Sequence, residues 1–368
     1  MAATSNSGLF WKVDMTKVPR LPLPMTPSEI LSDGSALEAE RALEAVNTKW
    51  RRFMKQYPRM ETSNLSRREL FGVALLAPAI VRAGPLAKHK ISIFSKHLQF
   101  LEGDALAAAV AEIGFEGVDL AVRKGGHIEP GNATTELPKL YGQFKKHGVE
   151  VTMLTTDIVD ADSPYASEVL GTMQSLGIRH YRWGGFKWTD AKPFAQQIED
   201  FKPRVDRLAK LNAKYGATAM YHTHSGVGVV GASIWDLHEI LAGFDPKLVG
   251  INYDIGHATV EGGLGGWIDS FKIAGDYVQG VAIKDFLWEK TAKGDYKDNW
   301  KPLGEGMVKL QQFATMLSAT KFDGPLQIHY EYPLGGADLG RKNPTMPKEE
   351  IFAYMKKDLL ALRGMLAK

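Results

Sequence analysis

Four apolar runs in the second half of the chain each end in side chains that bind metal ions or transfer protons. They read AMYHTHSG (Ala219–Gly226), GINYDIGHA (Gly250–Ala258), GVAIKDF (Gly280–Phe286) and LQIHYEY (Leu326–Tyr332). Each run is typical of a buried parallel strand. The carboxyl ends of parallel strands in a closed barrel meet at one rim. We therefore expect one site at that rim, formed by His222, His224, Asp254, His257, Asp285 and Glu331.

The spacing of the first residues favours metal binding. His222 and His224 are two residues apart, so both face the same side of a strand. Asp254 and His257 are three apart, which lets both enter one coordination sphere or places the histidine behind a ligand. Asp254 follows the apolar run Val249–Tyr253, where a buried carboxylate needs a cation nearby. The alternative is a helix N-cap at Asp254.

Lys284 and Glu331 are the residues expected to carry chemistry. A rim lysine can stabilise a substrate oxyanion, or it can pair with Asp285 or Glu331, and the sequence leaves both open. Glu331 lies between two tyrosines and is predicted to act as a metal ligand and as a base. His257 is the expected partner in proton transfer.

Residues from the first half of the chain are predicted to bind substrate. His97 follows the first strand, and Arg123 and His127 leave the second strand through a glycine pair. Trp183 offers an aromatic face for a sugar ring, with core packing as its alternative. His224 completes this predicted set.

Strand-like and helix-like stretches alternate from Lys90 onward. Eight such units in succession predict an α/β fold, a single (β/α)8 TIM barrel over 90–368 with an N-terminal extension. Several predicted helices end in glycine, the residue preferred there: Gly114, Gly148, Gly177 and Gly216. The predicted strands are Ile91–Ser95, Gly117–Val122, Glu150–Thr155, His180–Gly184, Thr218–His222, Gly250–Asp254, Gly280–Lys284 and Pro325–Glu331.

The N-terminal region is read as an extension followed by an export signal. Arg67 and Arg68 precede a short apolar run, so 60–86 resembles a twin-arginine signal. The segment 1–59 is interpreted as disordered or helical, and translation from Met60 would give the signal its usual position. This predicts a periplasmic or secreted protein, or a cytoplasmic one if the signal is not read. The alternative is a docked helix after a solvated arginine pair.

Composition narrows the classes of partner. The chain has 368 residues, a net charge of +3 and no cysteine. The charge is too balanced to indicate nucleic-acid binding, and the apolar run of the signal is too short for a stable membrane span. A divalent metal would need nitrogen and oxygen ligands, which suits Mn, Zn, Co, Fe or Mg. The oligomeric state is not predicted.

The ordered motifs GFEGVDL, YHTHSG, DIGHA, KDF, LGEG and YEY resemble the xylose isomerase-like barrel superfamily, which includes sugar phosphate isomerases and epimerases. The resemblance covers Lys90–Ala367. It implies a divalent cation held by Glu, Asp, His and Glu on the last four strands. Asp254 and Glu331 match two of these, and His222 replaces the first Glu. The usual seventh-strand histidine is Ala282 here, so either His224, His257 or Asp285 substitutes, or the metal is weakly bound or absent.

The resemblance implies an enzyme that acts on a sugar or keto-sugar. The expected reaction is proton abstraction next to a carbonyl, giving isomerisation, epimerisation or β-elimination. A metal-dependent phosphoester hydrolase and a non-catalytic sugar-binding barrel are the alternatives. The substrate is expected to be a small carbohydrate.

Overall fold

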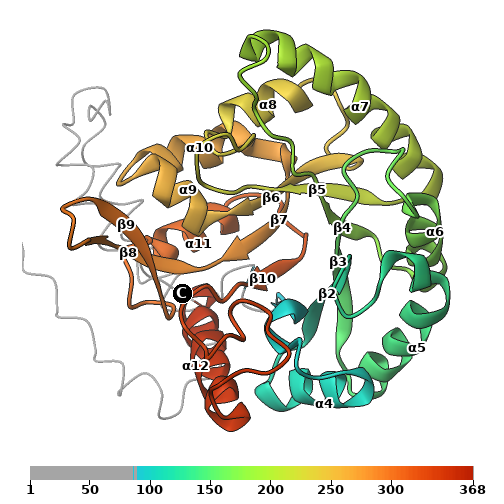
Figure 1. Cartoon of the computed structure of the whole chain (residues 1–368), viewed down its shortest axis with the longest axis vertical. Coiled ribbons are helices and arrows are strands. Elements are labelled where there is room, and N and C mark those ends of the chain that lie inside the picture. The colour runs from blue at the N-terminus through green and yellow to red at the C-terminus, as the bar shows by residue number, and fades with distance from the viewer. Residues whose placement is uncertain (1–85, 87–88, 368) are drawn as a thin grey trace, which may run out of the picture. The chain divides into compact units, whose positions relative to one another are not determined.

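The computed structural model describes Leu86 and residues 89–367, and these form a closed barrel of eight parallel strands (Figure 1). Neighbouring strands around the barrel follow the order β1-β10-β7-β6-β5-β4-β3-β2. The predicted TIM barrel is confirmed. Its strands are β1 (Ile91–Phe94), β2 (Gly117–Val122), β3 (Glu150–Thr156), β4 (His180–Trp183), β5 (Thr218–His222), β6 (Val249–Asp254), β7 (Val278–Ile283) and β10 (Leu326–Ile328).

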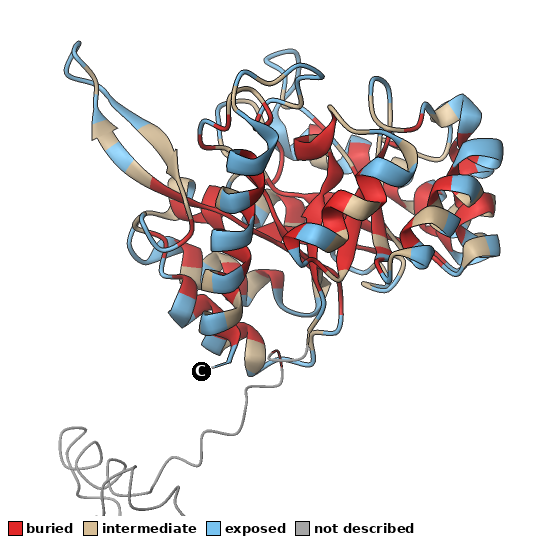
Figure 2. Ribbon diagram, turned by 90° about the horizontal axis from the view of Figure 1, so that it is seen from below, coloured by how far each residue is buried: buried red, intermediate tan, exposed pale blue. Residues whose placement is uncertain are grey.

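Helices surround the strands, and the buried residues lie between the two layers and inside the barrel (Figure 2). Each helix turns an apolar face inward, as α7 shows: its residues Phe201, Val205 and Leu208 are buried. The helices are α4 (Gly103–Ile113), α5 (Ala133–Lys146), α6 (Ala166–Leu176), α7 (Phe194–Tyr215), α8 (Trp235–Leu241), α9 (Ile255–Gly262), α10 (Gly266–Ala274), α11 (Leu310–Ser318) and α12 (Lys348–Leu366).

Glycine ends the helices where the sequence predicted it. Gly114, Gly177 and Gly216 follow α4, α6 and α7 with φ of 107°, 74° and 63°. Gly148 lies one residue beyond the C-cap of α5, with φ of 74°. A side chain is strained in this left-handed conformation, so glycine lets the chain turn directly into the next strand.

The last barrel strand is shorter than predicted. Strand pairing ends at Ile328, although the apolar pattern continues to Tyr332. The backbone N–H of Tyr330 donates to Nε2 of His97 (3.1 Å), a side chain following β1, instead of to a neighbouring strand. Residues 329–332 therefore leave the sheet while they stay at the mouth of the barrel.

A two-stranded antiparallel hairpin, absent from the predicted elements, follows β7. Strands β8 (Asp285–Lys290) and β9 (Tyr296–Lys301) pair along their whole length, with Phe286 opposite Trp300. Figure 1 shows the hairpin extending outward from the barrel, and its outer half is exposed. Its base lies at the carboxyl end of β7, beside the predicted site.

No helix within residues 89–367 is long and apolar enough to cross a membrane. The predicted extension 1–59 lies outside the described residues, as does the twin-arginine segment 60–86 except for Leu86.

Candidate active site

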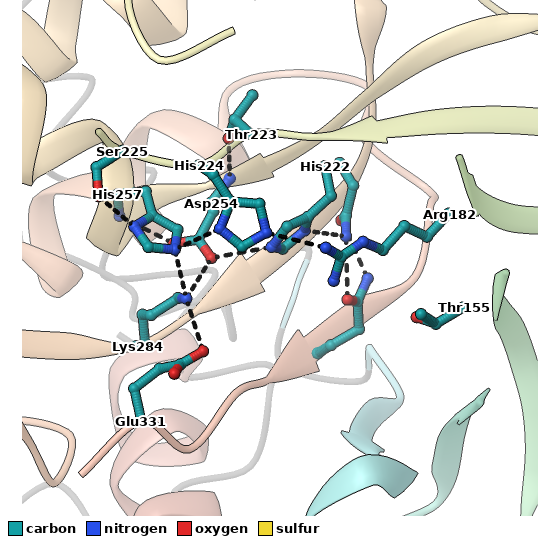
Figure 3. A network of polar contacts seen from close by, with 12 residues as sticks. Thr155, Arg182, His222, Thr223, His224, Ser225, Asp254, His257, Lys284 and Glu331 are labelled. Atoms are coloured by element: carbon teal, nitrogen blue, oxygen red, sulfur yellow. Dashed lines mark hydrogen bonds and ion pairs between the residues drawn. The ribbon is translucent and has the colours of Figure 1, made fainter. Parts of the chain in front are cut away.

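The strand ends bring polar side chains from the second half of the chain to one place. His222 and Asp254 are the last residues of β5 and β6, and Lys284 follows β7 directly. Glu331 lies three residues beyond the end of β10. Figure 3 shows these side chains pointing toward one another at the mouth of the barrel.

Three buried side chains offer nitrogen and oxygen atoms to a common point. One atom each from His222, Asp254 and His329 lies within 4.8 Å of the others. Nε2 of His222 is 3.5 Å from Oδ2 of Asp254. Nε2 of His222 and Nε2 of His329 are buried without a hydrogen-bond partner, and Oδ2 of Asp254 forms an ion pair with Nζ of Lys284. Unpaired buried polar atoms are costly, so this arrangement fits a divalent cation with imidazole and carboxylate ligands.

The carboxylate of Asp254 serves two purposes at once. Its Oδ1 accepts a hydrogen bond from the backbone N–H of His257 (3.0 Å), which caps the N-terminus of α9. Its Oδ2 faces His222 and Lys284, with Nζ of Lys284 at 3.0 Å. Asp254 can therefore cap the helix with one oxygen and still offer the other oxygen to a metal ion.

The buried side-chain amides of Asn252 and Gln327 fix the orientation of the His222 ring. Nδ2 of Asn252 lies 2.9 Å from Nδ1 of His222, and Asn252 and Gln327 exchange two hydrogen bonds of 3.2 and 3.1 Å. If both amides turn over together, Oδ1 of Asn252 accepts from Nδ1–H of His222 and the same pairing is kept. That orientation leaves the Nε2 lone pair of His222 free for a metal ion.

Lys284 is surrounded by acceptors. Besides Asp254, its Nζ lies 3.3 Å from Oε1 of Glu331 and 2.9 Å from Nε2 of His257. Nζ is also 4.8 Å from the ring centre of Trp300, a residue of β9. The side chain is 2% exposed, whereas that of Glu331 is 28% exposed. Glu331 is thus the member of this pair that an incoming substrate can reach.

A chain of hydrogen bonds fixes the proton positions on two histidines. A guanidinium only donates, so Arg182 donates from Nη2 to Nε2 of His224 (2.9 Å). Nδ1–H of His224 then donates to Nε2 of His257 (2.9 Å), and Nδ1–H of His257 donates to Oγ of Ser225 (2.8 Å). Nε2 of His257 therefore accepts hydrogen bonds from both His224 and Lys284.

Burial keeps these imidazoles neutral. Desolvation, with Arg182 and other nearby cationic groups adding to it, lowers the pKa of His222 well below its usual value. The pKa of His257 is lowered in the same way, with Lys284 as the next cause, and that of His224 falls to about 2. Burial raises the pKa of Asp254, while Lys284 opposes the shift. Neutral imidazoles are the form that binds metal ions.

The hairpin and a glycine of α9 hold Lys284 in place. Trp300 contacts the ring of His257 edge-on, with centroids 5.2 Å apart. A Cβ at Gly256 would lie 2.4 Å from Cγ of Lys284 and 3.1 Å from Cζ3 of Trp300. Only glycine leaves room there for the lysine to pass between α9 and the hairpin.

Comparison with known proteins assigns the family. The model of the family described as xylose isomerase-like TIM barrel matches residues 107–356. The chain belongs to this family. An inosose dehydratase of Lactiplantibacillus plantarum is 26% identical over 166 residues, which are 42% of this chain and 52% of that protein. The chain thus spans about half the length of this curated relative.

Two solved structures have the same fold as this xylose isomerase-like barrel. A probable 3-DHS dehydratase from Bacillus anthracis aligns with a TM-score of 0.54 and 17% identity, over 73% of this chain and 97% of that one. A 3-keto-D-glucoside 4-epimerase from E. coli aligns with a TM-score of 0.55 and 16% identity, over 75% and 100%.

Asp285 was predicted as a metal ligand, but it does not belong to the group formed by His222, Asp254 and His329. Its carboxylate accepts hydrogen bonds from the backbone N–H groups of Phe286, Gly304, Gly306 and Val308, at 2.9 to 3.0 Å. These bonds hold the LGEG loop against the start of the hairpin. Asp285 therefore organises the backbone, and His329 is the third member of the group with His222 and Asp254.

The predicted substrate-binding residues are divided between the mouth and the protein interior. Both ring nitrogens of His97 form hydrogen bonds with backbone groups: Nε2 accepts from the N–H of Tyr330, and Nδ1 donates to the carbonyl of Ala337 (3.4 Å). Nε2 of His127 lies 3.4 Å from the carbonyl of Leu98. Trp183 is buried, in edge contact with Phe186 and Tyr221.

His224 and Arg123 lie close to the group of polar side chains at the mouth of the barrel. His224 belongs to the hydrogen-bond chain, and Arg123 lies over the ring of Phe94, 5.3 Å from its centre. The sequence reasoning did not choose His329, Arg182 or Trp300. Strand alternation indicates two of them: Arg182 faces opposite to its neighbour Trp183, and His329 faces the same way as Gln327. Trp300 comes from the unanticipated hairpin and had no comparable signal.

Proposed function

We propose that this protein is a metal-dependent enzyme that removes a proton next to the carbonyl of a sugar or keto-sugar, leading to isomerisation, epimerisation or β-elimination. The observation that carries the proposal is the buried group of His222, Asp254 and His329, in which both imidazole Nε2 atoms lack a hydrogen-bond partner, beside Lys284 and Glu331. The inosose dehydratase, the probable 3-DHS dehydratase and the 3-keto-glucoside epimerase support this reaction class.

A divalent cation held by His222, Asp254 and His329 would act as a Lewis acid toward a carbonyl oxygen. Lys284 would stabilise, through its positive charge, the oxygen that gains negative charge when the neighbouring proton leaves. Its buried ammonium is already aligned by Asp254 and Glu331, so little reorganisation is needed.

Glu331 is the base in this proposal. Its carboxylate is partly exposed and lies 3.3 Å from Nζ of Lys284, so it can approach the carbon next to a carbonyl held beside Lys284. Return of the proton to a neighbouring carbon gives an isomer, and return to the other face gives an epimer. In β-elimination the electron pair instead expels a hydroxyl group, which leaves as water after protonation.

His257 and His224 position Lys284 and do not carry charge themselves. Both are neutral, and His257 accepts from Nζ of Lys284. One group of metal-binding residues is found within 89–367, whereas two-metal phosphoester hydrolysis needs ligands for a second ion. The reaction class proposed here needs one.

Solvent exchange tests the reaction directly. The metal-loaded enzyme is incubated in D2O with 3-keto-D-glucosides and inosose, and loss of the proton next to the carbonyl is followed by NMR. We expect exchange in the parent and none in Glu331→Gln with its metal content unchanged. Exchange in Glu331→Gln at the parent rate would show that another group is the base.

We also propose export through the twin-arginine segment. The pair Arg67–Arg68 before the apolar run Gly72–Val81 supports it. Expression of the full chain with Arg67→Lys and Arg68→Lys together is expected to keep the protein in the cytoplasm. An unchanged distribution between cytoplasm and periplasm would contradict the proposal.

A further inference from the structure

Three cationic side chains lie at the mouth of the barrel on the side of the first strands. Lys96 follows β1, Arg123 follows β2 and Arg182 belongs to β4. Within residues 89–367, no carboxylate oxygen lies within 4.0 Å of any of their charged nitrogens. Buried or half-buried charges are usually paired, so this side of the mouth lacks an anion.

Arg182, partly buried on β4, is the cation that contacts the histidine chain. Of its donors, Nη2 is used by Nε2 of His224 at 2.9 Å. Asp119, the acidic group that acts most strongly on Arg182, is buried, and its two oxygens accept from Oγ1 of Thr155 at 2.8 and 2.9 Å. Burial raises the pKa of Asp119 to about 7, so near neutral pH it carries only part of a negative charge.

Lys96 and Arg123 face the same region. Burial lowers the pKa of Lys96; Glu331 opposes this, and Lys284, Arg123 and Arg182 lower the pKa further. Arg123 lies over Phe94, whose ring stacks on His329 with centroids 5.0 Å apart. The cationic groups are therefore neighbours of the reacting groups without being paired to them.

The mouth thus has two chemically different halves. Strands β5, β6, β7 and β10 supply the metal ligands, Lys284 and Glu331, and strands β1, β2 and β4 supply the unpaired cations (Figure 3 shows Arg182 and Thr155 at this boundary). A substrate that spans the mouth places its carbonyl end on one half and its far end on the other.

We propose that the substrate carries an anionic group, a carboxylate or a phosphate, which Lys96, Arg123 and Arg182 bind while the carbonyl end reacts beside Lys284 and Glu331. The guanidinium groups suit either anion because each presents two parallel N–H donors. The assignment of the reacting end rests on the proposed function, whereas anion binding by the three cations does not.

Binding of matched sugars to the full chain tests this inference. D-Glucose, D-glucuronate and D-glucose 6-phosphate are titrated by calorimetry at constant ionic strength. We expect at least one anionic sugar to bind about tenfold or more tightly than D-glucose. D-Glucuronate and D-glucose 6-phosphate distinguish a carboxylate site from a phosphate site.

Two variants and a control locate the effect. Arg123→Gln and Lys96→Gln, both only partly buried, should each reduce the advantage of the anionic sugar over D-glucose by about fivefold to tenfold. Lys210→Gln removes the same charge from an exposed pair with Asp206 on α7 and should change nothing. Equal binding of all three sugars, or no binding of any, would overturn the inference.

The result separates this inference from the proposed function. An anion preference without solvent exchange on any acidic keto-sugar would retain the inference and contradict the reaction. Solvent exchange that is faster on neutral keto-sugars than on acidic ones would retain the reaction and overturn the inference.

Discussion

At the scale of single residues, the site depends on which polar atoms the backbone leaves free. His97 and Asp285 were predicted to face substrate and metal, yet their nitrogens and oxygens are hydrogen-bonded to backbone groups. His329 has an unpartnered Nε2 instead. Residue type and strand position indicate which side chains could belong to the site. They do not indicate which of these side chains will hydrogen-bond to the backbone of a distant loop, because that contact depends on the tertiary fold.

Asn252 is predicted to set the metal affinity through His222. Asn252→Leu removes the partner of Nδ1 of His222, so the ring loses both its orientation and its preferred proton position. We expect the affinity for Mn²⁺ or Zn²⁺ to fall by about 10- to 100-fold, measured by competition with a chelating dye. Asn212→Leu, another fully buried asparagine, should lower stability and leave metal affinity unchanged; equal losses in both variants would contradict the prediction.

Glu331→Gln is expected to lower turnover by about 10²- to 10⁴-fold, because an amide cannot accept the substrate proton. The change should appear in kcat more than in KM, and the metal content should stay the same because Glu331 lies outside the group of three donors. A metal content reduced along with turnover would show that Glu331 is a ligand, as the sequence first predicted.

At the scale of elements, the strand bounds could be predicted well and the hairpin could not. Hydrophobic runs and glycine stops locate the barrel strands because most of these strands are buried on both faces. The hairpin β8–β9 is half exposed, with charged residues between its aromatics, so the same apolar signal is missing. It nevertheless supplies Trp300, which lies over Lys284.

Gly256→Ala tests the packing of α9 against the hairpin. The added Cβ would displace Lys284 or Trp300, so we expect turnover to fall about tenfold or more while the barrel still folds. Gly142→Ala in α5 is the matched control, because nothing lies within 4 Å of its Cβ position. That variant should gain up to about 1 kcal/mol of stability at full activity. Full activity in Gly256→Ala would show that Lys284 does not need this position.

At the scale of the whole molecule, buried histidines tie stability to pH. Burial lowers the pKa of seven histidines in the folded protein and raises the pKa of four aspartates. The histidines are His97, His127, His180, His222, His224, His257 and His329. The aspartates are Asp119, Asp254, Asp285 and Asp358.

These shifts predict that the metal-free protein loses stability as the pH falls below about 6.5. In that window the unfolded histidines take up protons that the folded ones do not, so each contributes about 1.4 kcal/mol per pH unit. Above about pH 3.8 the four aspartates oppose this loss of stability, because they keep protons in the folded protein that they release in the unfolded chain. The seven histidines outnumber them, so the net stability still decreases as the pH falls. Urea unfolding at pH 7, 6 and 5 measures the slope; constant stability over this range would contradict it.

The barrel itself is the part of the structure that the sequence predicts best, because repeated strand and helix signals agree with one another. The proposed metal ligands are predicted less well, since they depend on which side chains at the ends of β5, β6 and β10 reach the axis together. Strand alternation alone relates His329 to Gln327, but only the closed barrel brings His329 to His222, with ring centroids 5.0 Å apart.

The central claim is that His222, Asp254 and His329 hold one divalent metal ion. Elemental analysis of the full chain, purified without chelator and reloaded with Mn²⁺ or Zn²⁺, tests it most directly when His329→Ala and Asp285→Asn are measured beside the parent. We predict about one ion per parent chain, a loss of bound metal in His329→Ala and retention in Asp285→Asn. A parent without metal after reloading, or a His329→Ala variant that retains it, would contradict the account.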